Sequence, residues 1–196
     1  WEVKTEILLL FAARYEHYKK VIKPAMDQGK LIICDRFIDS TIAYQCNGKK
    51  ELKDFCYHLS KLLLDDFMPD LTILLDINPK LTLGRIKERN ISNRYDKKSL
   101  EFFKKVRKEY INIAKEFSRV KVFNGEIKKE EISKQIISLI LKNNHILNNN
   151  QLLSICLFFY THSYYKYLIF YHVLLLKQEL VYLFFSQLNK GIISPF

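Results

Sequence analysis

The sequence predicts an α/β domain built on a parallel sheet, and three observations support this fold class. Short apolar runs rich in β-branched residues occur at 31–34, 71–75 and 120–123, which is typical of buried parallel strands. Longer segments with apolar residues at helical spacing separate these runs, and alternating strands and helices indicate crossover connections. A chain of 196 residues is also long enough to bury a core as one domain.

The first predicted element is a helix over residues 2–28. Apolar side chains recur along it at helical spacing, and Pro24 is expected to bend its later turns. Small Ala12 and Ala13 would let a ligand or a neighbouring element approach Arg14 on this helix. Arg14 could therefore clamp an anion or a base edge, although a surface arginine on an amphipathic helix is the simpler interpretation.

The remaining elements follow from apolar patterns and from helix start signals. Asn78 and Pro79 suit the N-cap and first position of a helix. The predicted helices after the first strand lie at 39–46, 51–66, 79–88, 99–117 and 129–141. Asp76 leaves the second strand, where it could lie near the functional crevice or cap the next helix.

The segment 31–45, LIICDRFIDSTIAYQ, contains the main candidate site. Open α/β sheets bind ligands at the carboxyl ends of their strands, so Asp35 and Arg36 should emerge where chemistry happens. A carboxylate there can hold Mg²⁺ directly or through water, and a guanidinium can bind phosphate with two hydrogen bonds. The alternative is an ordinary strand end with a solvated ion pair. Polar residues that could line a pocket for a polar ring follow at helical spacing: Asp39, Ser40, Thr41, Tyr44 and Gln45.

A second candidate is the basic segment 84–96, which contains Arg85, Arg89 and Arg94. Arg85 and Arg89 are four residues apart and would point the same way from a helix. Phosphoryl transfer uses such groups, because negative charge spreads over the equatorial oxygens in the transition state. A solvated charged loop is the alternative.

Composition narrows the function classes. The net charge of +11 suggests an anionic partner or substrate. No basic stripe interleaved with aromatic residues is present, so we do not expect nucleic-acid binding. The four cysteines lack metal-site or secreted-scaffold spacing and predict reduced thiols in a cytoplasmic protein.

Residues 143–196 form an apolar extension beyond a boundary predicted at Lys142. The uncharged stretch 146–165 could be a membrane helix, but its Asn, His and Tyr residues argue against membrane insertion. It could also be a helix packed over the core. A third interpretation, which we favour, is that the extension is translated AT-rich sequence that was not selected as protein.

Five sequence words together resemble the bacterial thymidylate kinase family, over about residues 2–141. They occur in the order and spacing of that family, and the DR-[FY]-x-x-S-[ST]-x-A-Y-Q word is specific. The matching words are TEILLLFAAR at 5–14, VIKPAM at 21–26, CDRFIDSTIAYQ at 34–45, MPDLTILLDINP at 68–79, and NRYD at 93–96 followed by EFFKKVRKEY at 101–110.

The resemblance implies ATP- and Mg²⁺-dependent phosphorylation of dTMP to dTDP for dTTP biosynthesis. It also implies the three-layer parallel sheet of P-loop nucleoside monophosphate kinases, and a homodimer is one assembly the family forms. On the acceptor side, Asp35 would help position Mg²⁺ and the acceptor phosphate, and Arg36 would bind the phosphate of dTMP. Arg85, Arg89 and Arg94 would belong to a lid that contacts the transferring phosphoryl group.

The resemblance also implies a site for the thymine base. Arg14 would contact the edge of the base, Thr41 and Gln45 would face it, and Tyr44 would pack nearby. The position of the family's base-stacking phenylalanine falls at Leu10, with Phe11 one residue later, so Leu10 or Phe11 is expected to pack on the base.

The sequence departs from the family pattern at the donor side. No G-x-x-x-x-G-K-[ST] motif occurs among the 196 residues, although this Walker A loop supplies the backbone amides and lysine that hold donor phosphates. The chain begins with Trp1, and we expect a domain that is incomplete at its N-terminus. The alternative function is therefore a non-catalytic remnant of a thymidylate kinase that binds at most dTMP.

Overall fold

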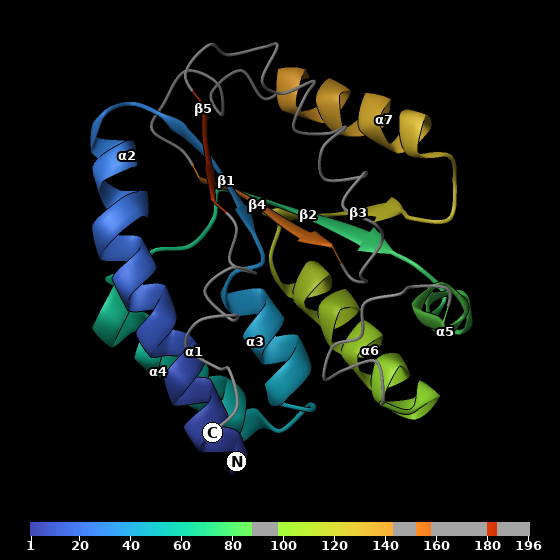
Figure 1. Cartoon of the computed structure of the whole chain (residues 1–196), viewed down its shortest axis with the longest axis horizontal. Helices are drawn as coiled ribbons and strands as arrows, with labels where there is room; N and C mark the ends of the chain where they lie inside the picture. The colour runs from blue at the N-terminus through green and yellow to red at the C-terminus, as the bar shows by residue number, and fades with distance from the viewer. Residues whose placement is uncertain (88–97, 143–151, 158–179, 184–196) are drawn as a thin grey trace.

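The computed structural model describes residues 1–87, 98–142, 152–157 and 180–183 (Figure 1). Helices and strands alternate along the chain, and each strand and helix predicted up to Lys142 is present to within a few residues. The helical elements are α1 (Val3–His17), the π-helical turn η1 (Tyr18–Ile22), α2 (Lys23–Asp27), α3 (Ile38–Gln45), α4 (Lys50–Leu64), α5 (Pro79–Lys87), α6 (Leu100–Glu116) and α7 (Lys129–Lys142). The strands are β1 (Leu31–Asp35), β2 (Leu71–Asp76), β3 (Val120–Asn124), β4 (Leu152–Leu157) and β5 (Leu180–Leu183).

The strands form one parallel sheet in the order β3-β2-β4-β1-β5. The predicted parallel sheet is therefore confirmed. In β1 and β2, Ile32, Ile33, Ile73 and Leu74 are completely buried, as expected for strands that are covered on both faces.

The strands β4 and β5 come from the apolar extension and join the same sheet. β4 lies between β1 and β2, where Ile155 pairs with Asp35 on one side and with Ile73 on the other. The two helical interpretations of 146–165 are therefore wrong for 152–157. A strand in the middle of a sheet needs apolar residues on both faces, and such a run cannot be distinguished from a buried helix by periodicity.

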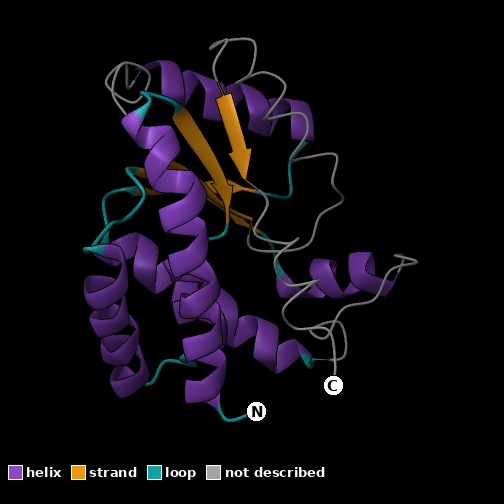
Figure 2. Cartoon of the chain, turned by 60° about the vertical axis from the view of Figure 1, so that its left-hand side comes forward, coloured by secondary structure: helices purple, strands orange, loops and turns teal. Residues whose placement is uncertain are grey.

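Helices cover both faces of the sheet (Figures 1 and 2). The main core lies between the sheet and the helices α1, α3, α4 and α6, while α7 crosses the opposite face (Figure 1). Ile132, Ile136 and Ile140 of α7 are completely buried because residues four apart share one helix face. Among the described residues, no helix is both long and apolar enough to cross a bilayer.

Local signals explain where several helices begin. The side chain of Asn78 accepts a hydrogen bond from the amide of Lys80 at 3.0 Å, and Ser99 Oγ accepts from the amide of Phe102 at 3.2 Å. Pro24 lies in the first turn of α2, directly after the π-helical turn. Proline lacks an N–H and crowds the preceding turn, and a widened π-turn accommodates this disturbance.

Candidate functional site

The turn that follows β1 has a strained backbone. Asp35 ends the strand with 5% of its surface exposed, and Arg36 adopts a left-handed conformation with φ of 67°. This conformation costs a non-glycine residue about 1 kcal/mol, and such strain concentrates at functional sites. The Cys34 thiol donates a hydrogen bond to the Arg36 carbonyl oxygen at 3.3 Å and so supports the turn.

The left-handed turn directs the Arg36 side chain toward α3. The guanidinium carbon lies 4.9 Å from the centre of the Tyr44 ring, and Nη2 lies 3.4 Å from the Tyr44 hydroxyl. Tyr44 in turn packs edge-on against Phe102 and Tyr110 of α6. A guanidinium carries five N–H donors, so one that packs on an aromatic ring can also bind an anion. The structure therefore brings Arg36 and Tyr44 together directly after Asp35 at the end of β1, and the role of these residues in a site stays a prediction.

Helix α1 is joined to the same region by two side-chain contacts. Arg14, with 2% of its surface exposed, donates from Nη2 to the Phe37 carbonyl oxygen at 3.0 Å. Gln45 Nε2 donates to Glu6 Oε1 at 2.9 Å. Arg14 therefore lies beside the Arg36 turn, and Gln45 lies at the interface of α1 and α3.

Thr41 lies on α3, four residues before Gln45, and therefore on the same face of the helix. Its surface is 1% exposed, and among the described residues its hydroxyl has no hydrogen-bond partner. Buried hydroxyl groups are nearly always satisfied by protein, water or ligand. The Thr41 hydroxyl thus provides a hydrogen-bonding group for a polar ligand beside α3.

The structure separates the two candidates for packing on a base. Phe11 is completely buried within the main core, and its ring centre lies 5.7 Å from the guanidinium carbon of Arg14. Leu10 retains 9% exposure and is not part of that core cluster. Leu10 is therefore better placed than Phe11 to meet a ligand without disturbing the core.

Asp76 does not lie beside Asp35. Asp35 and Ile73 both pair with Ile155 of β4, so they lie at the same level of the sheet. Asp76 is three residues further along β2, and β2 is two strands away from β1. Each of these displacements is about 10 Å. Both carboxylate oxygens of Asp76 accept hydrogen bonds from Arg107 of α6, at 2.6 and 2.7 Å. The cap of α5 is Asn78 instead.

The lid residues are only partly covered by the structure. Arg85 lies in α5, but its side chain is outside the description, and Arg89 and Arg94 lie outside the described residues altogether. Their role stays a prediction.

The side chains that fix α3 were missed by sequence reasoning. Tyr110 donates to Ser40 at 2.8 Å, and Arg119 binds Asp39 at 2.7 and 2.8 Å. These partners are 70 and 80 residues apart, and no local pattern indicates such contacts. A charged residue directly before a predicted strand, as Arg119 is, is the one available signal.

The side chains at the turn after β1 suit Mg²⁺, but they do not suit a metal ion that needs three or more protein ligands. Within the described ranges, no group of three or more His, Cys, Asp or Glu side chains could hold a metal ion. Mg²⁺ usually keeps several waters and binds one or two carboxylates together with substrate phosphates. The single Asp35 carboxylate fits that mode. Cys34, Cys46 and Cys56 are buried and form no disulfide with one another, and the Sγ atoms of Cys46 and Cys56 lie 3.6 Å apart. The reduced state of the thiols stays a prediction.

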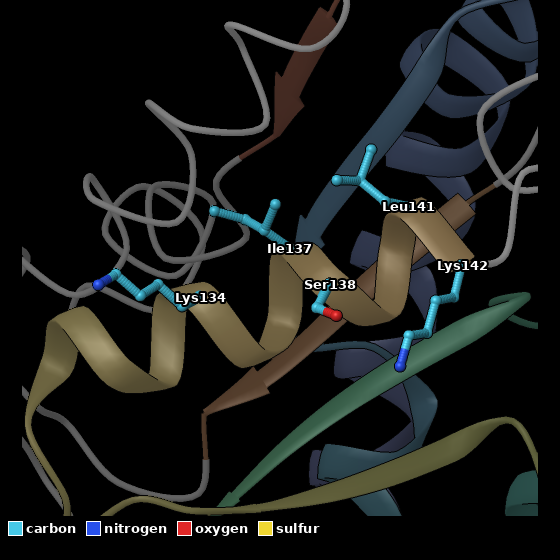
Figure 3. A pocket seen from close by; sticks show the side chains of 5 residues that line it. All are labelled: Lys134, Ile137, Ser138, Leu141 and Lys142. Atoms are coloured by element: carbon cyan, nitrogen blue, oxygen red, sulfur yellow. The ribbon is translucent and has the colours of Figure 1, made fainter.

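A separate surface hollow of about 400 Å³ lies on α7 (Figure 3). It shares no residue with the turn after β1 or with α3, so we assign it no role in the site. Its lining residues are Lys134, Ile137, Ser138, Leu141 and Lys142.

Comparisons with known proteins agree on one family. A family model described as thymidylate kinase matches residues 1–136. The thymidylate kinase of Orientia tsutsugamushi (strain Ikeda) is 39% identical over 145 residues, which cover 70% of this chain and 66% of that protein. The thymidylate kinase of Rickettsia africae (strain ESF-5) is 40% identical over 102 residues, covering 52% of this chain and 50% of the relative.

A solved structure of thymidylate kinase from Ehrlichia chaffeensis matches the fold with a TM-score of 0.55 and 30% sequence identity. The match covers 72% of this chain and 67% of the other, and it supports the α/β fold of P-loop nucleoside monophosphate kinases. The matched part of this chain spans about half to two thirds of the length of the two curated relatives.

Proposed function

Because the chain belongs to the thymidylate kinase family, we propose that it binds dTMP at the turn after β1 and serves ATP-dependent phosphorylation of dTMP to dTDP. The observation that carries this proposal is the strained Arg36 turn at the end of β1, in which the guanidinium lies over the Tyr44 ring. A protein accepts such strain where it orients a group for function.

The contacts support a division of roles within the nucleotide. Arg36 would bind the phosphate of dTMP through its guanidinium edge. Arg14, Thr41 and Gln45 would bind the polar edge of the base, since they lie on the facing surfaces of α1 and α3. Leu10 would pack on the base, and Tyr44 holds Arg36 in place.

On the acceptor side, Asp35 would hold Mg²⁺ through water and help position the phosphate of dTMP, and the ion would neutralise charge on the phosphates of ATP. Arg85, Arg89 and Arg94 would cover the transferring group as the lid. The chain's own contribution is then positioning and electrostatic stabilisation, with little covalent chemistry.

A second candidate function is binding of dTMP without phosphoryl transfer. It is favoured by the absence of a G-x-x-x-x-G-K-[ST] motif among the 196 residues, because that loop forms the donor-phosphate site in P-loop enzymes. Formation of ADP by this chain with ATP, Mg²⁺ and dTMP would exclude this second candidate.

Calorimetric titration with dTMP, dUMP, dCMP and dAMP tests the shared part of both candidates. We expect dTMP to bind most tightly, and Arg36→Ala to abolish binding because the phosphate loses its partner. Equal affinity for all four nucleotides, or unchanged dTMP affinity of Arg36→Ala, would contradict the assignment.

A further inference from the structure

Helix α3 is fixed to the sheet by one buried ion pair. Asp39, in the first turn of α3, accepts hydrogen bonds on both carboxylate oxygens from Arg119, at 2.7 and 2.8 Å. Arg119 Nη1 also donates to the Thr72 hydroxyl at 2.8 Å, and its carbonyl accepts from the Thr72 amide at 2.9 Å. Arg119, Asp39 and Thr72, here termed the α3 anchor, thus connect α3 to β2 and to the start of β3.

The α3 anchor differs from an ordinary surface ion pair because its side chains are buried. Asp39 and Thr72 are each 1% exposed, and the Arg119 side chain is 14% exposed. The desolvation cost of two buried charges offsets much of their attraction, so a buried ion pair is weak evidence for stability. Such a pair does impose one geometry, because a planar guanidinium and a carboxylate fit together in one plane.

The α3 anchor sets the orientation of α3, the helix that carries residues of the proposed nucleotide site. Thr41 and Tyr44 lie two and five residues after Asp39 on the same short helix, and Arg36 lies three residues before it. The Cys34 thiol of β1 supports the Arg36 turn and Tyr44 packs on α6, while Asp39 is the α3 residue that the α3 anchor pairs with β2 and the start of β3. The orientation of α3 therefore depends on Asp39, with Ser40 bound to Tyr110 as a further attachment.

We propose that Arg119 and Asp39 are positioning residues that set the selectivity of the site for the thymine base, by fixing the orientation of α3 relative to β2. This inference rests on the proposed function, since it assumes that Thr41 and Gln45 face the base. Because Arg119 and Asp39 are paired with each other, and Arg119 with Thr72, they would act on the nucleotide through α3 and not by direct contact.

Arg119→Lys tests the proposal because it keeps the charge but loses the planar pair of donors. We expect dTMP affinity to fall about 3- to 10-fold, in the range of the net contribution of one ordinary hydrogen bond. The ratio of the dissociation constants for dCMP and dTMP should also fall toward one, because cytosine differs from thymine at the polar edge that Thr41 and Gln45 would face. A smaller folded fraction would weaken the apparent binding of both nucleotides equally and leave this ratio unchanged. The ratio therefore distinguishes a change in the position of α3 from a loss of stability.

The matched control is Arg107→Lys, which alters the other Arg–Asp pair with two hydrogen bonds, at Asp76. This variant should retain the wild-type ratio. If Arg119→Lys does not fold, Thr72→Val removes the hydroxyl that accepts from Arg119 and donates to Asp39, and it should also lower the ratio. Thr72→Ser keeps the hydroxyl and the wild-type ratio. An unchanged ratio in Arg119→Lys, or in Thr72→Val where Arg119→Lys does not fold, would overturn the proposal.

Hydrogen exchange of α3 amides, measured without nucleotide, separates this proposal from the proposed function. Faster exchange in α3 is expected for Arg119→Lys but not for Arg107→Lys. If the wild-type chain has no preference for dTMP, the proposed function fails and the selectivity role fails with it. Exchange rates that are equal in both variants would overturn the positioning role itself.

Discussion

At the scale of single residues, the left-handed backbone of Arg36 lowers the stability of the fold, while its side chain is proposed to bind dTMP. Two substitutions can separate these effects. Glycine adopts the left-handed conformation without strain, whereas alanine does not. We expect Arg36→Gly and Arg36→Ala to lose dTMP binding alike, but the glycine variant should be more stable than the alanine variant by about 1 kcal/mol. Urea unfolding and dTMP titration of both variants provide the measurement. Equal stability would mean that the left-handed turn is not retained in solution.

His17 makes the stability of the fold depend on pH. Burial, together with the positive charge of Arg14, lowers the pKa of His17 below its ordinary value of 6.5. The unfolded chain therefore binds this proton more tightly than the folded chain. Neutral His17 makes its full contribution to the free energy of unfolding at pH values above 6.5, the pKa of His17 in the unfolded chain. This contribution is lost as the pH falls from 6.5 toward the lower pKa of His17 in the folded chain.

We expect the free energy of unfolding to decrease as the pH is lowered from about 8 to about 5, and His17→Gln to flatten this dependence. Urea unfolding at several pH values measures it. The control is His58→Gln, because His58 is exposed on α4 and its replacement should leave the curve unchanged. A wild-type slope retained in His17→Gln would exclude His17 as its source.

At the scale of elements, α1 has an apolar face without a partner among the described residues. Trp1, Leu8 and Tyr15 are 79%, 48% and 37% exposed. Leu8 and Tyr15 are seven residues apart and lie on one side of α1, and Trp1 precedes the helix, which begins at Val3. Association of two chains would remove these side chains from water, so we propose that α1 forms the interface of a homodimer.

Leu8→Lys should shift the dimer toward monomer, because a charge replaces apolar surface at the centre of this face. Sedimentation velocity at several concentrations measures the shift. Leu62→Lys is the matched control, since Leu62 is 76% exposed on α4 and its replacement should not change the association. A wild-type chain that sediments as a monomer would rule out this interface.

The sequence predicted elements up to Lys142 well because local chemistry determines them. Asn78 and Ser99 mark helix starts, and the β-branched runs mark strands. The position of Asp35 and Arg36 at the end of β1 followed from the same patterns. Contacts such as Arg119 with Asp39 were not predictable, since they join residues 80 positions apart and depend on how the elements pack. β4 was also missed, because a uniformly apolar run fits a helix and a buried strand equally well.

At the scale of the whole molecule, the sheet joins the two parts of the chain into one hydrogen-bonded unit. β1, which ends at Asp35, and β2, which contains Thr72 of the α3 anchor, do not pair with each other, and β4 pairs with both. Without β4, each would leave a row of backbone groups without partners at the centre of the sheet, and burying such groups unpaired is costly. The relative position of β1 and β2 therefore depends on β4.

Ser154→Pro tests this dependence within the intact chain. Ser154 pairs with Cys34 of β1 and Thr72 of β2, and proline in a central strand removes a hydrogen-bond donor and distorts the ladder. We expect the variant to lose about 3 kcal/mol or more of stability and to bind dTMP more weakly, because Asp35 and the α3 anchor would shift. Ser154→Ala is the control and should unfold like the wild type in urea. If Ser154→Pro has wild-type stability, β4 does not hold the sheet in solution, and the interpretation of residues 143–196 as sequence not selected as protein would be preferred.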